Sequence, residues 1–138
     1  MFQRETDFSD GYVNLWMIKP AGKDMTRITN DPYSDTDASW SPTSKYIVYS
    51  TDYEASTGSA GANLFIVAAT ANGTRFRLTS QCYYDGAPSW SPDANWVSFE
   101  TALVRDDNNP TKTAVWRIPA FARPPAPKCW PSRDDQAT

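Results

Sequence analysis

The feature that most constrains this chain is an internal repeat with a period of about 50 residues. Ser-Trp-Ser-Pro stands at residues 39–42 and returns without substitution at 89–92. Asn-Leu-Trp-Met-Ile at 14–18 returns as Asn-Leu-Phe-Ile-Val at 63–67, and a third copy, Val-Trp-Arg-Ile, begins at Val115. Chance does not preserve one spacing over so many positions, so the chain is a repeat protein.

Each repeat unit has the pattern of four short antiparallel strands. A first strand (38–41 or 88–91) leads into a Ser-Pro turn, where proline presets φ for a type I turn. A second strand (45–51 or 95–101) is rich in β-branched and aromatic residues. The third strand is expected at 14–19, 63–68 or 114–118, and the fourth, after a Gly-containing turn, ends at Thr29 or Thr79. Four strands at this period predict the blade of a β-propeller, an all-β fold.

The length of 138 residues is too short for a closed ring of such blades. Residues 1–118 are predicted to hold two to two and a half blades, in units of about 12–51, 52–101 and a partial 102–118. Residues 119–138 form a Pro-rich tail that does not suit a central strand. Closure would need additional chain, or copies in which residues 14–29 of one complete the last sheet of another. A trimer of such copies would have six blades, and an open array along a fibre is a third geometry, which leaves the ring unclosed.

Composition excludes several classes of function. Histidine is absent, which removes His-based triads and His-ligated metal sites. The net charge is −3 and basic residues are scattered, so no nucleic-acid partner is expected. The mean hydropathy of −0.59 and the lack of a long apolar run argue against membrane insertion, and the N-terminus lacks the apolar core of a signal peptide. No phosphate-binding, dinucleotide or Gly-x-Ser-x-Gly motif occurs. We therefore expect no enzyme activity and no cofactor.

A metal site is not expected either. Asp31, Asp35 and Asp37 resemble an oxygen-rich calcium loop, but the downstream glycine and bidentate glutamate are missing. Cys82 and Cys129 are too few for a cysteine-built zinc site; they form either one disulfide in an oxidising compartment or two unpaired thiols. Asn72 begins an Asn-Gly-Thr glycosylation sequon in a turn expected to be exposed.

A binding face is expected at one end of the blades. There the loops between the second and third strands lie beside the loops that join one blade to the next. These loops bring acidic and tyrosine side chains together, which suits a protein or a carbohydrate partner. The candidate residues are Tyr33, Asp35, Asp37, Tyr83, Tyr84, Asp85, Asp106 and Asp107. The alternative for the two equivalent residues Asp35 and Asp85 is a purely structural role, in which each holds its turn by Asx hydrogen bonds.

The Ser-Trp-Ser-Pro residues are assigned structural roles. Because Trp40 and Trp90 occupy the same repeat position, they are expected to pack within or between blades; stacking on a sugar is the alternative. Pro42 and Pro92 are expected to set the turn that follows.

The order Asn-Leu-Phe-Ile-Val, Gly turn, Arg-Leu-Thr, acidic loop, Ser-Trp-Ser-Pro-Asp resembles the TolB-type, WD-like β-propeller repeat family over residues 12–120. The family places glycine where this chain has Ser44 and Ala94, and the first copy replaces the aspartate by Thr43. These departures predict an altered hairpin in the same fold. The resemblance implies a non-catalytic domain for protein–protein contact in an extracellular or periplasmic protein.

Three functions follow as hypotheses. The first is a non-catalytic propeller module that associates with itself or belongs to a larger envelope or secreted protein. The second is the accessory propeller of a serine peptidase or another enzyme whose catalytic domain lies elsewhere. The third is a structural subunit of an extracellular fibre.

Overall fold

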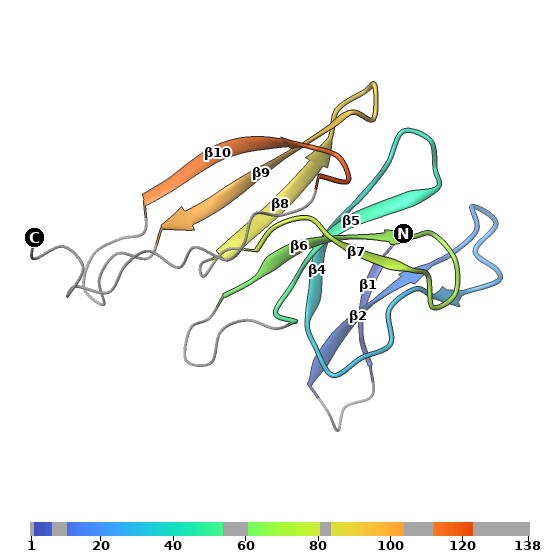
Figure 1. Ribbon diagram of the computed structural model, residues 1–138. Coiled ribbons are helices and arrows are strands. Elements are labelled where there is room, and N and C mark those ends of the chain that lie inside the picture. The colour runs from blue at the N-terminus through green and yellow to red at the C-terminus, as the bar shows by residue number, and fades with distance from the viewer. Residues whose placement is uncertain (1, 7–10, 54–60, 81–83, 104–111, 123–138) are drawn as a thin grey trace, which may run out of the picture.

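The computed structural model describes residues 2–6, 11–53, 61–80, 84–103 and 112–122 (Figure 1). Within these ranges all regular structure is β, with no helix, and the strands form three antiparallel sheets. None of the sheets closes into a barrel. The expected fold class is therefore confirmed: the chain is all-β, with sheets of three to four strands that correspond to blades of an incomplete propeller.

The three sheets, here called blades 1 to 3, follow one another along the chain. Blade 1 has the strand order β1 (Phe2–Thr6), β2 (Tyr12–Met17) and β3 (Thr26–Arg27). Blade 2 has the order β4 (Asp35–Trp40), β5 (Tyr46–Thr51), β6 (Asn63–Ala68) and β7 (Arg75–Arg77). Blade 3 consists of β8 (Tyr84–Trp90), β9 (Trp96–Leu103) and β10 (Lys112–Pro119), with β9 in the middle.

One strand, β1, is absent from the sequence-based expectation. It pairs with β2 over its own whole length, from Phe2 opposite Trp16 to Thr6 opposite Tyr12. Among the described residues, blade 1 thus has counterparts of β5, β6 and β7. Within one chain, β2 and β3 form a sheet with β1; the expectation that residues 14–29 complete the last sheet of another copy stays a prediction.

The end of blade 3 follows the expected pattern more closely. Its third strand, β10, has no fourth strand beside it among the described residues. Pro119 is still the last residue of β10, and the predicted tail beyond Ala122 lies outside the described residues.

The Ser-Pro turns have the same geometry in blades 2 and 3. Ser44 donates its N–H to the Ser41 carbonyl over 2.9 Å, and Ala94 donates to Ser91 over the same distance. Ser44 and Ala94 have φ of 59° and 61°, in the left-handed region that favours glycine. The turn that the TolB-type repeat closes with glycine is thus kept here, with backbone strain at both positions.

Two apolar cores hold the blades together. Core 1, between blades 1 and 2, contains Leu15, Ile28, Ile47, Tyr49, Phe65 and Val67. Core 2, between blades 2 and 3, contains Val48, Leu64, Ile66, Leu78, Val97 and Phe99. Side chains alternate along β5 and β6, so blade 2 contributes one face to each core. Full burial of each such side chain stabilises the fold by about 1.5–3 kcal/mol.

Phe121, just after β10, closes the rim of core 2. Its ring centroid lies 4.9 Å from that of Tyr46, 5.6 Å from Phe76 and 6.2 Å from Trp90. Edge-to-face and tilted contacts at these distances are favourable for aromatic rings. Phe121 therefore ties the end of blade 3 back onto blade 2.

Candidate functional site

The structure separates the residues of the expected binding face. Tyr33, Asp37 and Tyr84 lie wholly or partly at the surface, whereas Asp35 and Asp85 are fully buried and cannot contact a partner directly. Tyr83, Asp106 and Asp107 lie outside the described residues.

Asp37 joins blade 2 to blade 3. It sits in a β-bulge of β4 with φ of 53°, and Ala87 occupies the equivalent bulge of β8 with φ of 47°. The Asp37 carboxylate accepts hydrogen bonds from the Tyr84 hydroxyl, over 3.1 Å, and from the Ala87 N–H, over 3.3 Å. Burial and the neighbouring Asp37 raise the pKa of Tyr84, because both disfavour the phenolate. Asp37 and Tyr84 therefore act together as a cross-blade contact.

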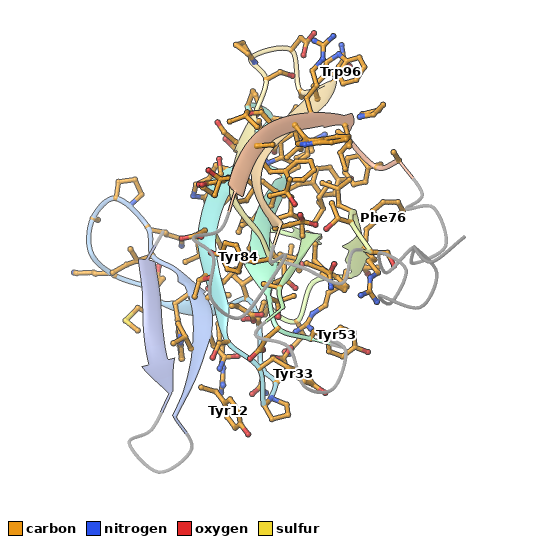
Figure 2. All side chains as sticks on the ribbon, turned by 90° about the vertical axis from the view of Figure 1, so that its left-hand side faces the viewer. Tyr12, Tyr33, Tyr53, Phe76, Tyr84 and Trp96 are labelled. Atoms are coloured by element: carbon orange, nitrogen blue, oxygen red, sulfur yellow. The ribbon has the colours of Figure 1, made fainter. Side chains whose placement is uncertain are left out.

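Tyrosines gather at one end of the molecule. Figure 2 shows Tyr12, Tyr33 and Tyr53 at the same end, the lower one in that view. The rings of Tyr33 and Tyr53 pack edge to face at 4.9 Å, and Tyr53 in turn packs edge to face on Phe65 at 5.6 Å. Sequence reasoning missed Tyr12 and Tyr53, although both flank loops that join a second to a third strand, where it expected a binding face.

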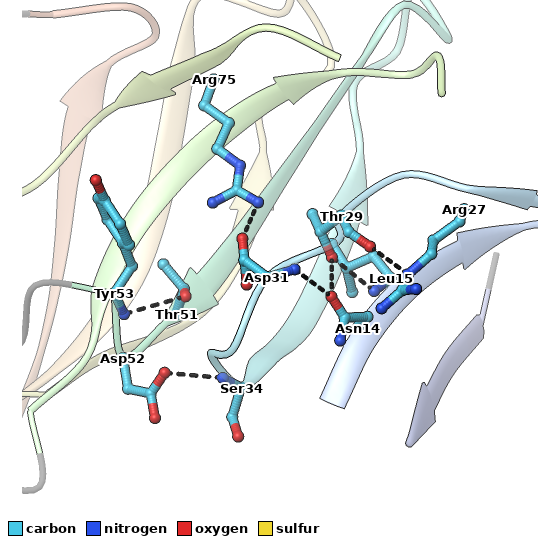
Figure 3. Close-up of polar contacts among 10 residues, drawn as sticks. All are labelled: Asn14, Leu15, Arg27, Thr29, Asp31, Ser34, Thr51, Asp52, Tyr53 and Arg75. Atoms are coloured by element: carbon cyan, nitrogen blue, oxygen red, sulfur yellow. Dashed lines mark hydrogen bonds and ion pairs between the residues drawn. The ribbon is translucent and has the colours of Figure 1, made fainter. Parts of the chain in front are cut away.

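The loop that carries Tyr33 is fixed by polar contacts. Ser34 donates its N–H to the Asp52 carboxylate over 2.8 Å. These contacts form part of a wider set between blades 1 and 2 (Figure 3). At the tyrosine end, which comprises Tyr12, Tyr33 and Tyr53, these contacts hold Tyr33 and Tyr53 in place, so their rings can contact a partner.

Arg75 and Asp31 form a half-buried ion pair that sequence reasoning did not identify. Arg75 extends from β7, and Asp31 lies in the loop that links blades 1 and 2 (Figure 3). The N–H of Asp31 also donates to the side-chain oxygen of Asn14 over 3.2 Å. The pair thus connects the last strand of blade 2 to the start of β2.

Asp35 and Asp85 occupy equivalent buried positions at the start of β4 and β8. Burial raises the pKa of Asp35 to about 6, and the nearby hydroxyls of Thr29 and Thr51 offset part of this rise. Burial also raises the pKa of Asp85, against the effect of Thr101 and Thr79. Among the described residues neither carboxylate accepts a well-formed hydrogen bond, so the expected Asx bonds are not seen, while the threonine hydroxyls lie near enough to favour the charged form in part. A buried carboxylate without a bonded donor is a source of pH-dependent stability.

The other residues that were assigned a role from the sequence lie as follows in the structure. Trp40 packs against core 1 and Trp90 against core 2, each half-buried at the edge of its core. Pro42 and Pro92 are exposed in their turns. Asn72 is exposed, with φ of 51°, in the turn between β6 and β7. Cys82 and Cys129 lie outside the described residues.

The outer face of blade 3 differs in chemistry from the matching face of blade 2. Four buried positions of blade 2 are Val48, Ser50, Leu64 and Ile66, and the same register places Ser98, Glu100, Val115 and Arg117 there in blade 3. The Arg117 guanidinium lies over the Trp96 ring, 4.5 Å from its centroid. This face is mostly polar, whereas the face of blade 1 that points away from blade 2 carries Trp16 and Ile18, both half-buried.

The described residues contain neither a metal-binding cluster nor a membrane-spanning helix. No group of three or more carboxylate or thiol side chains is close enough to hold a metal ion there. That part of the chain also contains no helix long and apolar enough to cross a membrane.

Fold and surface together define a repeat protein with partial propeller blades. No family model matches the chain. A stretch of 37 residues is 40% identical to the Tol-Pal system protein TolB of Nitratidesulfovibrio vulgaris, over 27% of this chain and 8% of that protein. The chain is thus similar to a small part of TolB, shorter than one repeat, which supports the resemblance to TolB-type repeats over that length alone.

Proposed function

We propose that this chain is a non-catalytic interaction module of the β-propeller type, which packs against further blades. Those blades come from copies of itself or from the rest of a larger protein. The observation that carries the proposal is the difference between the two outer faces of the blade array: the blade 1 face carries half-buried Trp16 and Ile18, and the blade 3 face carries the charged Glu100 and Arg117.

The apolar face belongs to blade 1. In blade 2, Phe65 and Val67 are buried against blade 1. The repeat places Trp16 and Ile18 at the same positions of blade 1, directed away from blade 2. Of the described strands, none packs on this face. Large apolar side chains at positions that elsewhere form an interblade core favour contact with another blade.

The polar face belongs to blade 3. Glu100 and Arg117 stand where blade 2 buries Ser50 and Ile66. Packing another blade there would bury both charges, which is unfavourable without matched partners. A polar outer face is what the terminal repeat of an array requires. This chemistry favours assembly through blade 1 over a head-to-tail fibre.

The tyrosine end supports a second contact within the same function. Tyr12 is exposed at the same end of the molecule as the Tyr33–Tyr53 pair, and tyrosine combines apolar area with a polar tip. A protein or carbohydrate partner fits this surface. An extracellular or periplasmic location is proposed from the resemblance and from the similarity to TolB.

Sedimentation velocity over a concentration series tests the proposal. We expect the wild-type chain to associate, Ile18→Lys to remain monomeric, and the matched control Val115→Lys on the polar face to associate like wild type. Circular dichroism checks that both variants fold. A monomeric wild type assigns the blade 1 face to another polypeptide. Association that survives Ile18→Lys contradicts the role of this face, and filaments would favour the fibre.

A further inference from the structure

Blades 1 and 2 bind their last strand through the same set of contacts. In blade 1, Arg27 lies directly opposite Trp16 in the strand register, and its guanidinium is 5.7 Å from the ring centroid. In blade 2, Arg77 lies opposite Phe65, and the corresponding distance is 5.4 Å. An arginine over an aromatic face is a favourable cation–π arrangement.

The two residues after each arginine complete these contacts. The Leu15 N–H donates to the Thr29 hydroxyl over 2.9 Å, and the Leu15 carbonyl accepts the Ile28 N–H over 2.9 Å. In blade 2, the Leu64 N–H donates to the Thr79 hydroxyl over 2.9 Å, and its carbonyl accepts the Leu78 N–H over 2.8 Å. In blades 1 and 2, the third strand therefore contacts three successive residues at the end of the blade: an arginine, an aliphatic residue and a threonine.

The third strand of blade 3 has similar residues at the positions that contact the fourth strand in blade 2. The register places Val115 at the position of Leu64 and Trp116 at the position of Phe65. Phe65 is almost completely buried, whereas Trp116 is 56% exposed and Val115 is 82% exposed. Of the strands that the structure describes, none lies along the outer edge of β10 (Figure 1). An unpaired strand edge offers backbone donors and acceptors to another strand.

We propose that the outer edge of β10 binds an extended strand of a partner polypeptide that carries Arg-Leu-Thr or Arg-Ile-Thr. The arginine covers the Trp116 indole. The threonine hydroxyl accepts the Val115 N–H, and the aliphatic residue donates its N–H to the Val115 carbonyl. The bound strand completes blade 3 as β7 completes blade 2. This inference rests on the proposed function, because it names the chemistry of one partner of the interaction module.

The charges near this edge are compatible with a basic strand. Arg117 alternates with Trp116 along β10, so it is directed to the opposite face of the sheet, where it lies over Trp96. It does not compete for the Trp116 ring.

Blade 3 departs from the pattern at one position. Asn14 in blade 1 accepts a hydrogen bond from the Thr29 hydroxyl over 3.4 Å, and Asn63 is the equivalent residue of blade 2. Blade 3 has Ala114 there. Because this amide orients the threonine hydroxyl, Ala114→Asn is expected to strengthen binding of the proposed strand several-fold.

The test uses the full chain and a fluorescent peptide with the sequence of residues 73–80, Gly-Thr-Arg-Phe-Arg-Leu-Thr-Ser. Fluorescence anisotropy is expected to show saturable binding. Alanine in place of the second arginine, or N-methylation of the leucine amide, should each weaken it about tenfold. These two peptides test the side-chain contact and the backbone hydrogen bond separately.

Variants of the chain locate the site. Trp116→Ala should weaken binding about tenfold, Trp116→Phe should retain it because Phe65 serves in blade 2, and Ala114→Asn should strengthen it. Circular dichroism shows whether Trp116→Ala folds. If this variant does not fold, stronger or unchanged peptide binding by Ala114→Asn decides whether the β10 edge is the site. Equal binding by wild type and Trp116→Ala overturns the proposal. Failure of the peptide to bind the wild-type chain also overturns the proposal. This result is expected if another segment of the same chain or a second copy occupies the edge of β10.

Ile18→Lys separates this inference from the proposed function. Its substitution lies on blade 1, so it should bind the peptide as wild type does. If Ile18→Lys abolishes association while the peptide fails to bind wild type, only the inference about β10 is wrong. If the peptide binds as described while association does not depend on Ile18, the proposed role of blade 1 fails and the β10 site stands.

Discussion

The hydroxyl of Tyr84 donates a hydrogen bond to the carboxylate of Asp37 across the boundary between blades 2 and 3. The two side chains come from the first strands of neighbouring blades, β4 and β8. Asp37 also accepts the N–H of Ala87, so one carboxylate fixes both the phenol and the bulged backbone of the next blade. Ala87 occupies the repeat position of Asp37, and it has no carboxylate to continue the pattern.

Replacement of Asp37 should weaken the contact between these blades. Asp37→Ala removes both hydrogen bonds and leaves a non-glycine residue without a polar side chain in the left-handed region. We expect a loss of about 1–2 kcal/mol in the free energy of unfolding, measured by urea denaturation. Asp37→Asn is the matched control, since asparagine tolerates this φ and keeps an acceptor. A loss from Asp37→Asn as large as that from Asp37→Ala would show that charge, and not the hydrogen bonds, is responsible.

Glycine at the strained turn positions should stabilise the chain. Ala94 has φ of 61°, where a Cβ is unfavourable, and Ala94→Gly relieves this strain at some cost in unfolded-state entropy. The expected net gain is about 0.5–1 kcal/mol, seen as a higher urea midpoint. Ala94→Val should be destabilising, because a β-branched residue suits this φ least. If glycine lowers the midpoint, the turn is not strained.

Stability should fall as pH rises through the titration of Asp35. Its pKa is raised from 3.8 to about 6 by burial, so the folded state retains a proton that the unfolded chain has released. The resulting stabilisation is fully present below pH 3.8 and is lost as the pH rises to about 6; a two-unit shift corresponds to about 3 kcal/mol. Asp85 contributes in the same direction.

Asp35→Asn is expected to flatten this dependence, because the amide does not titrate. Urea unfolding at a series of pH values from acid to neutral measures it. The control is Asp93→Asn: Asp93 is exposed, and its hydrogen bond with Ser91 lowers its pKa. An unchanged pH profile in Asp35→Asn would contradict the assignment to Asp35.

Arg75 should be coupled to the same titration. It pairs with Asp31 and lowers the pKa of Asp35 through its charge. Arg75→Gln is expected to destabilise the fold by about 1–3 kcal/mol and to move the pH transition upward. Exposed Arg117→Gln serves as the control and should leave the pH of the transition unchanged. A transition that stays at the wild-type pH in Arg75→Gln would rule out the coupling.

The strands of blades 2 and 3 could be predicted from the sequence because their residues recur at one spacing, Ser-Trp-Ser-Pro above all. β1 could not be, since Phe-Gln-Arg-Glu-Thr resembles neither later second strand. It is recognised only by its pairing with β2, a tertiary property.

The candidate site was less predictable than the fold. From sequence alone, an aspartate in a polar loop is expected to be a surface residue. The burial of Asp35 and Asp85 depends instead on how neighbouring blades pack. The Asp31–Arg75 pair joins residues 44 positions apart, outside the period of the repeat. By contrast, the recurrence of Arg-Ile-Thr and Arg-Leu-Thr was visible in the sequence. Its role, an arginine laid over the aromatic residue of the adjacent strand, needed the register.

The unequal outer faces also restrict how such a chain can change in length by gene duplication. Leu15 with Ile28 and Leu64 with Leu78 occupy equivalent positions in the two cores, so an extra unit inserted between existing blades should meet compatible neighbours. A unit added after blade 3 would instead meet Glu100 and Arg117. Duplications should therefore survive upstream of β8 and be lost downstream of β10, which gives this repeat array a direction of growth.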